Sequence, residues 1–248
     1  MGKPMFKLGS TIDLETAHQA LVTQTRCQIP GLLDAADYAR VLKAVDDVPR
    51  WVLVTRLGGR HLDLDAEAMY DLPAAKRIEF ERQVHVDAAK GFQYLYETYP
   101  LYDKWHNGTL RPEVPLLADL FEWLNGETFL GAMRTLLDEP RISFADAQLT
   151  RYRTGHFLNT HDDGVEGKNR VAAYVLTLSP EWKREWGGTL KFMDASGKEI
   201  DRFVPGPNTL SMFKVPQPHE VLPVAKKVKQ ARLSITGWLR MGEDPGPG

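Results

Sequence analysis

The sequence contains a single cysteine, Cys27, among its 248 residues. One cysteine allows no disulfide within the chain and no metal site built mainly from thiolates, and it favours a reducing compartment. An excess of charge of one sign is also missing, because 31 lysines and arginines oppose 33 aspartates and glutamates. This balance provides no general attraction to nucleic acid or to an anionic membrane surface.

Long apolar runs are absent as well. No stretch approaches the roughly 20 residues that a membrane-spanning helix needs, and the first 15 residues lack the apolar core of a secretory signal. We therefore expect a cytoplasmic protein that has neither a membrane nor a nucleic acid as its partner. The composition, 43% hydrophobic and 26% charged, is that of a globular chain able to bury a core.

The first 140 residues carry mainly helical patterns, in which apolar residues recur near a period of 3.6. Helices are expected from Asp13 onward, over residues 35–48, in part of 74–101, and over 116–137 with an interruption at Gly126. A short strand at residues 51–55 should close with the turn-prone pair Gly58 and Gly59.

After residue 140 the pattern changes to short runs rich in β-branched and aromatic residues, separated by turns that contain glycine, proline or asparagine. Five such runs are expected to be strands, at residues 142–152, 171–178, 189–193, 208–213 and 231–239. This spacing favours an antiparallel sandwich or barrel covered on one face by the preceding helices, which is an α+β fold in a single domain. Residues 241–248 should form a flexible tail.

Candidate metal ligands begin at His161. In an extended segment, His161 and Asp163 point to the same side, because strand side chains alternate with a period of two. His219, which lies further along the chain among prolines and apolar residues, is the best candidate for a third ligand. Two histidines and one carboxylate form the facial triad of non-haem Fe(II) oxygenases. Polar residues in a surface turn remain an alternative explanation, and His156 is the one rival ligand.

The last predicted strand supports the metal site. Leu233, Ile235 and Leu239 alternate with Arg232, Ser234, Thr236 and Trp238. If the apolar set packs on helices, Arg232 points into the barrel, where a charged guanidinium needs an anion. A dicarboxylate cosubstrate would supply that anion, and Ser234 on the same face could add a hydrogen bond. An arginine paired with a protein carboxylate is the alternative.

These motifs in this order resemble the 2-oxoglutarate- and Fe(II)-dependent oxygenases, in their prolyl hydroxylase-like branch. The resemblance covers roughly residues 145–240, and residues 91–96 match only vaguely. It runs through residues 152–163, 170–178, 182, 187–190, 208–213, 219–223 and 232–238.

The resemblance implies a double-stranded β-helix (jelly roll) supported by N-terminal helices, with His161, Asp163 and His219 as iron ligands. It also implies that Arg232 binds the distal carboxylate of 2-oxoglutarate and that Tyr152 contacts the same cosubstrate. Two departures stand out. Thr177 occupies a position where relatives often carry a second tyrosine, and a lysine-rich turn lengthens the segment between His219 and Arg232.

The expected activity is hydroxylation of a C–H bond with O2, releasing succinate and CO2, with ascorbate as an accessory reductant. The substrate expected first is a prolyl residue in a protein or peptide. A free amino acid or other small molecule, a zinc hydrolase or isomerase, and a non-catalytic metal-binding barrel are the alternatives. Nothing in the sequence indicates the oligomeric state.

Overall fold

The computed structural model describes residues 6–247. The start of the chain and Gly248, the last residue of the predicted tail, therefore lie outside the described residues. The helices are α1 (Leu14–Thr23), α2 (Ala35–Ala44), α3 (Ala66–Tyr70), α4 (Ala74–Ala88), α5 (Leu101–His106), α6 (Leu110–Glu113), α7 (Pro115–Leu124) and α8 (Glu127–Leu137), with 3-10 turns at Val45–Asp47 and Arg184–Trp186. Within residues 6–247, no helix is long and apolar enough to cross a membrane.

The strands belong to one continuous sheet whose pairs are all antiparallel. They are β1 (Arg26–Pro30), β2 (Val52–Leu57), β3 (Arg60–Asp65), β4 (Tyr94–Tyr99), β5 (Ile142–Ala145), β6 (Gln148–Tyr152), β7 (Phe157–His161), β8 (Arg170–Thr177), β9 (Leu190–Met193), β10 (Glu199–Phe203), β11 (Thr209–Lys214), β12 (His219–Val221) and β13 (Arg232–Met241). The order is β1-β11-β8-β13-β6-β4-β7-β12-β9-β10, with the β2–β3 hairpin joined to β4 and β5 joined to β13.

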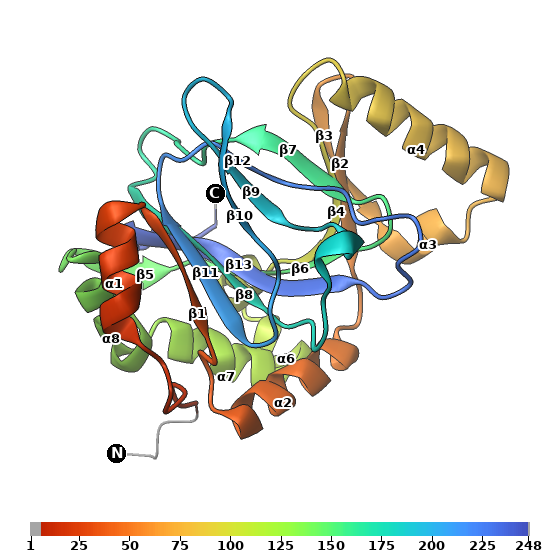
Figure 1. The fold of residues 1–248 in the computed structure, drawn as a ribbon. Helices are drawn as coiled ribbons and strands as arrows, with labels where there is room; N and C mark the ends of the chain where they lie inside the picture. The colour runs from red at the N-terminus through yellow and green to blue at the C-terminus, as the bar shows by residue number, and fades with distance from the viewer. Residues whose placement is uncertain (1–5, 248) are drawn as a thin grey trace.

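Strand β4 joins the two halves of this sheet. Its residues Glu97–Tyr99 pair with β6, while Tyr94 and Leu95 pair with β7. The sheet therefore turns back over itself at β4 and nearly closes into a jelly-roll-like barrel, as predicted (Figure 1).

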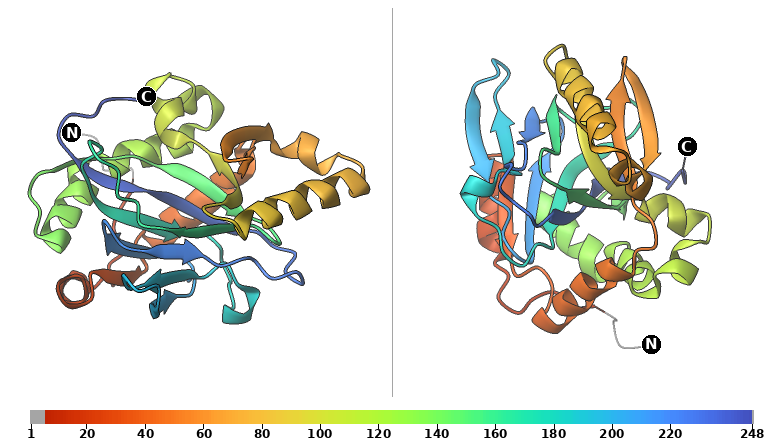
Figure 2. Two further views of the ribbon diagram at one scale, coloured as in Figure 1. Left: turned by 90° about the horizontal axis from the view of Figure 1, so that it is seen from above. Right: turned by 90° about the vertical axis from the view of Figure 1, so that its right-hand side faces the viewer.

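Helices α1, α2, α7 and α8 cover the outer face of the β1-β11-β8-β13-β6 half (Figure 1). Helix α7 begins at Pro115, a residue well suited to the first helical turn, and buries Leu117, Leu120 and Phe121. The main core lies between this helical layer and the sheet. A smaller apolar cluster lies inside the barrel and includes Phe192, Phe213 and Val221. In the views of Figure 2, α4 lies far from α7 and α8.

The predicted helices are confirmed in outline. Asp13 caps α1 by accepting the backbone N–H of Thr16, and the expected helix of residues 116–137 divides into α7 and α8 near Gly126. The first 140 residues also contain strands that the sequence analysis did not place, which are β1, β3 and β4. Each pairs at an edge or junction of the sheet, where few apolar residues alternate and the sequence pattern is weak.

The predicted flexible tail is in part anchored. The Asp244 carboxylate accepts a hydrogen bond from the hydroxyl of Tyr102 and lies 3.1 Å from Nε2 of His106. Both partners belong to α5 or its end, more than 130 residues earlier in the sequence. The chain is therefore tied down beyond Gly242, which composition alone does not indicate.

Candidate metal centre

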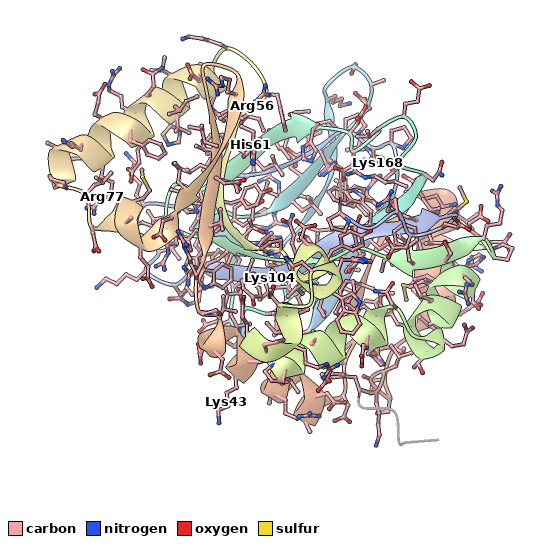
Figure 3. The ribbon with its side chains drawn as sticks, turned by 180° about the vertical axis from the view of Figure 1, so that it is seen from behind. Lys43, Arg56, His61, Arg77, Lys104 and Lys168 are labelled. Atoms are coloured by element: carbon pink, nitrogen blue, oxygen red, sulfur yellow. The ribbon has the colours of Figure 1, made fainter. Side chains whose placement is uncertain are left out.

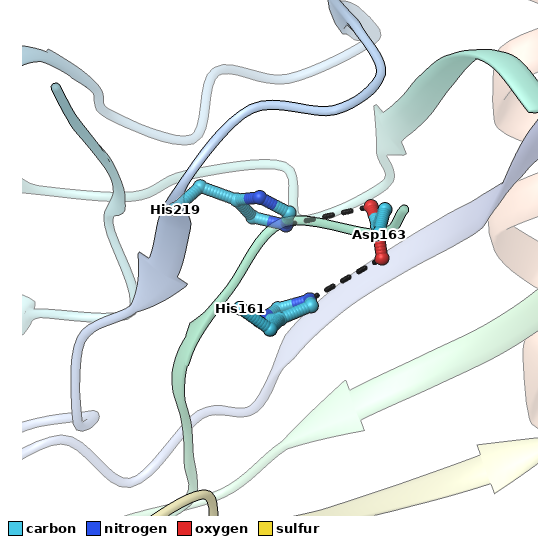
Figure 4. A group of neighbouring side chains, drawn as sticks. All are labelled: His161, Asp163 and His219. Atoms are coloured by element: carbon cyan, nitrogen blue, oxygen red, sulfur yellow. Dashed lines mark ion pairs between the residues drawn. The ribbon is translucent and has the colours of Figure 1, made fainter. Parts of the chain in front are cut away.

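His161 and His219 meet across two paired strands. His161 ends β7 and His219 begins β12, and the register of this antiparallel pair sets the two residues opposite each other. Their ring centroids are 4.1 Å apart. Asp163 completes the group, since one donor atom from each residue lies within 4.8 Å of the others. Figure 4 shows the carboxylate facing both imidazoles.

Asp163 reaches this position differently from the sequence prediction. Strand β7 ends at His161, and Asp163 has a φ of +62°, in the left-handed region. The expected strand alternation is therefore wrong beyond His161. Two contacts hold the turn: Arg170 Nη1 donates to the Asp163 carbonyl at 2.9 Å, and the Gln217 N–H donates to the Asp162 carbonyl at 3.1 Å. The left-handed residue folds the carboxylate back between the two rings.

Each imidazole is oriented by a hydrogen bond to the backbone carbonyl of the residue two positions earlier in the chain. Nδ1 of His161 lies 2.9 Å from the Asn159 carbonyl, and Nδ1 of His219 lies 2.7 Å from the Gln217 carbonyl. A carbonyl can only accept, so each Nδ1 carries the proton and each Nε2 keeps its lone pair. The Nε2 atoms face Asp163, at 3.4 Å from Oδ1 for His161 and 3.6 Å from Oδ2 for His219.

The electrostatics favour the ligand forms of His219 and Asp163. Burial, reinforced by neighbouring His161, lowers the pKa of His219 to about 4, so its ring is neutral. Burial by itself would raise the pKa of Asp163, but the two neighbouring imidazoles outweigh burial and lower that pKa, so the carboxylate is ionised. Neutral imidazole and ionised carboxylate are the forms that bind a metal ion.

The triad opens into a cavity of about 430 Å³ inside the barrel. Arg232 lines this cavity and is 3% exposed. Its Nε has no hydrogen-bond partner among residues 6–247, and no carboxylate offsets the lowering of its pKa by burial. Its guanidinium lies 5.3 Å from the ring centroid of Tyr152. The predicted inward arginine is thus present, and the alternative of an arginine paired with a protein carboxylate does not apply within these residues.

The close packing around Arg232 depends on a glycine. Gly188 has a φ of +61°, and a Cβ atom there would lie 3.1 Å from Cδ of Arg232 and 3.3 Å from Trp182. Any side chain at this position would therefore press on the stem of the arginine.

The two other predicted cosubstrate contacts lie in different places. Tyr152 lines the cavity and stacks on Tyr96, with centroids 5.1 Å apart and planes 11° apart. Ser234 is fully buried, its Oγ has no partner among the described residues, and it is not part of the cavity wall. Thr177 lies directly across from Ser234 on β8.

The rival histidine lies elsewhere. His156 belongs to a buried group with Tyr70 and Glu97, and only His161, Asp163 and His219 form a metal-type cluster in the described part of the chain. The lysines of the turn before Arg232 are exposed. Trp182 and Trp186 pack against each other and do not line the cavity.

Arg170 and Phe92 line the cavity and had no assigned role in the sequence analysis. Arg170 stacks on Trp238, with its guanidinium carbon 3.5 Å from the ring centroid. Phe92 is 44% exposed and its ring centroid lies 5.7 Å from that of His161. Tyr94 and Tyr96 continue the aromatic wall inward from Phe92. Only the inward alternation of Trp238 could have indicated these contacts in advance.

Comparison with known proteins matches residues 147–240 to the family described as the 2OG-Fe(II) oxygenase superfamily. A curated relative, Prolyl 3-hydroxylase OGFOD1 of Xenopus laevis, is 32% identical over 130 residues, covering 50% of this chain and 23% of the relative. The protein of the same name from Mus musculus is 36% identical over 107 residues, covering 40% of this chain and 18% of that protein. The chain thus spans less than a quarter of the length of these relatives.

Solved structures share the fold at low sequence identity. A Pseudomonas putida prolyl-4-hydroxylase aligns with a TM-score of 0.58 and 19% identity, covering 93% of this chain and 100% of that chain. A second solved structure is a prolyl hydroxylase from Trichoplax adhaerens in complex with a hypoxia inducible factor oxygen degradation domain peptide fragment. It aligns with a TM-score of 0.60 and 16% identity, covering 92% of this chain and 89% of that chain. The predicted family resemblance and the predicted fold are both confirmed.

Proposed function

We propose that this chain, which belongs through residues 147–240 to the 2OG-Fe(II) oxygenase superfamily, is a dioxygenase that hydroxylates a C–H bond of a prolyl residue in a protein or peptide. Fe(II) and 2-oxoglutarate are the cofactor and cosubstrate that the family implies. Succinate and CO2 would be released with the hydroxylated product. The proposal concerns this chain alone, because the relatives are much longer.

The donor set fits iron. His161 and His219 offer lone pairs on Nε2, and Asp163 offers a carboxylate between them. Two imidazoles and one carboxylate leave part of the coordination sphere of a metal ion open, as non-haem Fe(II) oxygenases require. Bound there, the iron would supply the activation of O2.

Arg232 is the observation that carries the proposal. A guanidinium that is 3% exposed and has no carboxylate partner in residues 6–247 is costly. A dicarboxylate bound in the cavity that Arg232 and the triad both line would remove that cost. Arg232 would therefore hold the distal carboxylate of 2-oxoglutarate, with the ring of Tyr152 beside it. Ser234 would contribute only if its buried hydroxyl turns toward the same carboxylate.

The cavity mouth suits a prolyl substrate. Phe92, Tyr94 and Tyr96 form a wall of aromatic rings beside His161, and aromatic faces pack well against a saturated ring. The curated relatives are named prolyl 3-hydroxylases, and the Trichoplax adhaerens enzyme binds a peptide. Both facts support a peptide substrate over a free amino acid.

The first experiment is to add Fe(II) and 2-oxoglutarate to the apo-protein without oxygen and record the visible charge-transfer band between metal and keto acid. We expect the band in the wild type, its loss in His161→Ala and its weakening in Arg232→Met. His156→Ala serves as a matched control, because His156 is a buried histidine outside the site. Absence of the band from folded, metal-loaded wild type would refute the oxygenase proposal.

The substrate is tested separately. Proline-containing peptides and free proline would be incubated with the iron-loaded protein, and succinate formation and a mass increase of one oxygen atom would be measured. Coupled succinate formation with peptides only supports the proposal. Coupling with a free amino acid only would replace it by small-molecule hydroxylation. Repeating the assay with ascorbate tests whether that reductant sustains turnover.

A further inference from the structure

A second cavity, of about 480 Å³, lies on the opposite face of β4 from the metal centre. Tyr94 and Tyr96 point into the metal cavity, whereas Leu95 between them lines the second one. Helices α3 and α4 cover it, and α4 packs on the sheet where His85 stacks with Phe157, at 5.2 Å between centroids. Figure 3 shows Arg77, one of its lining residues, on α4 beside α3.

Two lining residues, Tyr70 and Arg153, belong to an ionic cluster around Glu97, which is fully buried. Its carboxylate accepts hydrogen bonds from Nε of Arg151 and, at 2.7 Å, from Nε of Arg153. The hydroxyl of Tyr70 donates to it at 2.6 Å. One negative charge is therefore shared by two guanidinium groups, which leaves one positive charge in excess beneath the cavity.

Basic side chains at the rim of the cavity add to this excess of positive charge. Arg153 lines the cavity with a side chain that is 42% exposed, so its terminal nitrogens are accessible beyond the Nε contact. Arg77 and Lys229 also line it, and neither forms an ion pair with a carboxylate within residues 6–247; Arg77 instead donates to the Tyr70 carbonyl. Glu81 is the one acidic residue of the lining. The cavity is thus strongly cationic in a protein that is nearly neutral overall.

The remaining walls are apolar and come from Leu53, Met69, Phe80 and Leu95. His156 adds a polar atom without a partner, because its Nδ1 is buried and makes no hydrogen bond to the described residues. The cavity therefore combines apolar walls with a comparable share of polar and charged lining, and its size falls within the usual range of small-molecule sites, about 300–1,000 Å³.

We propose that this cavity binds a small amphipathic anion, with its carboxylate between Arg153, Arg77 and Lys229 and its apolar body between α4 and β4. The carboxylate offsets the cationic excess, and the apolar body covers the leucine and phenylalanine walls. This site is separate from the metal centre, so the proposal stands independently of the oxygenase activity.

The test measures ligand binding to the apo-protein by calorimetry or ligand-observed NMR, with hexanoate as the probe. Hexanol, which has the same chain length without a charge, and inorganic phosphate, which has charge without an apolar body, are the comparison probes. We expect hexanoate to bind more tightly than either. Arg77→Gln should weaken hexanoate about tenfold, and the more exposed Lys229→Gln about threefold. Lys226→Gln, a lysine of the same turn outside the cavity, is the matched control.

A filling variant, Met69→Trp, checks the location by removing hexanoate binding while the circular dichroism spectrum is kept. The proposal is overturned if hexanoate does not bind at millimolar concentration, if hexanol binds equally well, or if the two charge variants bind as the wild type does. Displacement of hexanoate by 2-oxoglutarate would also overturn it, because the probe would then occupy the metal cavity. Preference for an acidic peptide over hexanoate would replace the small ligand by a protein segment.

Discussion

Two groups of buried arginines lie on opposite sides of the same pair of strands, β4 and β6. Inside the barrel, Arg232 is 3% exposed and its guanidinium lies near the ring of Tyr152. Outside it, Arg151 pairs with fully buried Glu97, and its guanidinium lies 4.1 Å from the ring centroid of Trp51. The first arginine lacks a counter-charge within residues 6–247, and the second has one.

The difference separates a binding site from a structural cluster. A buried charge is tolerated when it is paired and hydrogen-bonded, and is costly when it is not. Glu97 and Arg151 satisfy each other, so their contribution is to the fold. Arg232 has no such partner among residues 6–247, so we propose that its contribution is to binding an anion in the cavity beside the triad. A substitution in the Glu97 cluster should therefore lower the free energy of unfolding, whereas a substitution of Arg232 should mainly weaken ligand binding.

The largest expected effect comes from breaking the paired side. Glu97→Gln leaves the largely buried Arg151 without its counter-charge, and removing one partner of a buried ion pair costs about 3–5 kcal/mol. Chemical denaturation should report a loss of that size in the free energy of unfolding. Glu113→Gln is the matched control, because Glu113 likewise accepts from a tyrosine and a cation, Tyr99 and Lys104, but is 30% exposed. A loss for Glu97→Gln no larger than for Glu113→Gln would contradict the structural role.

The second largest effect is on the pH dependence of stability, and it arises from His156 beside the Glu97 cluster. Burial lowers the pKa of His156 to about 4, against the opposing attraction of Glu97. The folded protein favours the neutral ring, so this stability is present above pH 6.5 and is lost as the pH falls from 6.5 to about 4. The loss is about 3 kcal/mol. In His156→Phe, the free energy of unfolding should fall less steeply across this interval, because up to one fewer proton is taken up on unfolding. An unchanged slope would contradict the prediction.

The unpaired side is tested by ligand stabilisation. Adding 2-oxoglutarate to the Fe(II)-loaded wild type without oxygen should raise its free energy of unfolding by about 2.7 kcal/mol when the ligand exceeds its Kd about 100-fold. Arg232→Met should abolish this increment, while the increment from Fe(II) alone should persist. Equal stabilisation of both proteins by 2-oxoglutarate would show that Arg232 does not hold the cosubstrate.

The smallest expected effect is on the apo-protein itself. Arg232→Met removes a charge that has no partner in the described structure, so the unfolding free energy should change by less than about 1 kcal/mol. A loss comparable to that of Glu97→Gln would mean that Arg232 has a structural partner, and the contrast between the two arginine groups would fail. Thermal or chemical denaturation of the metal-free protein measures this change in the free energy of unfolding.

The strongest sequence patterns predicted the structure best. Clean alternation in residues 231–239 correctly set Arg232 and Trp238 on the inner face, and helical periodicity correctly indicated α2, α7 and α8. Strands β1, β3, β4 and β10 were missed. Strands β1, β3 and β10 are edge strands with polar or mixed residues, and β4 is the strand that joins the two halves of the sheet. A strand of this kind is stabilised by its partner rather than by its own pattern.

Sequence alone determined which residues could form the metal centre and that an inward Arg232 would need an anion, because side-chain chemistry and strand alternation are local properties. Tertiary structure decided the rest. The left-handed turn at Asp163, the pairing of His161 with His219 across β7 and β12, and the pairing of Arg151 but not Arg232 with a carboxylate all depend on segments distant in the chain. Local patterns carry no information about which distant partner will be adjacent, and burial makes the presence or absence of that partner decisive.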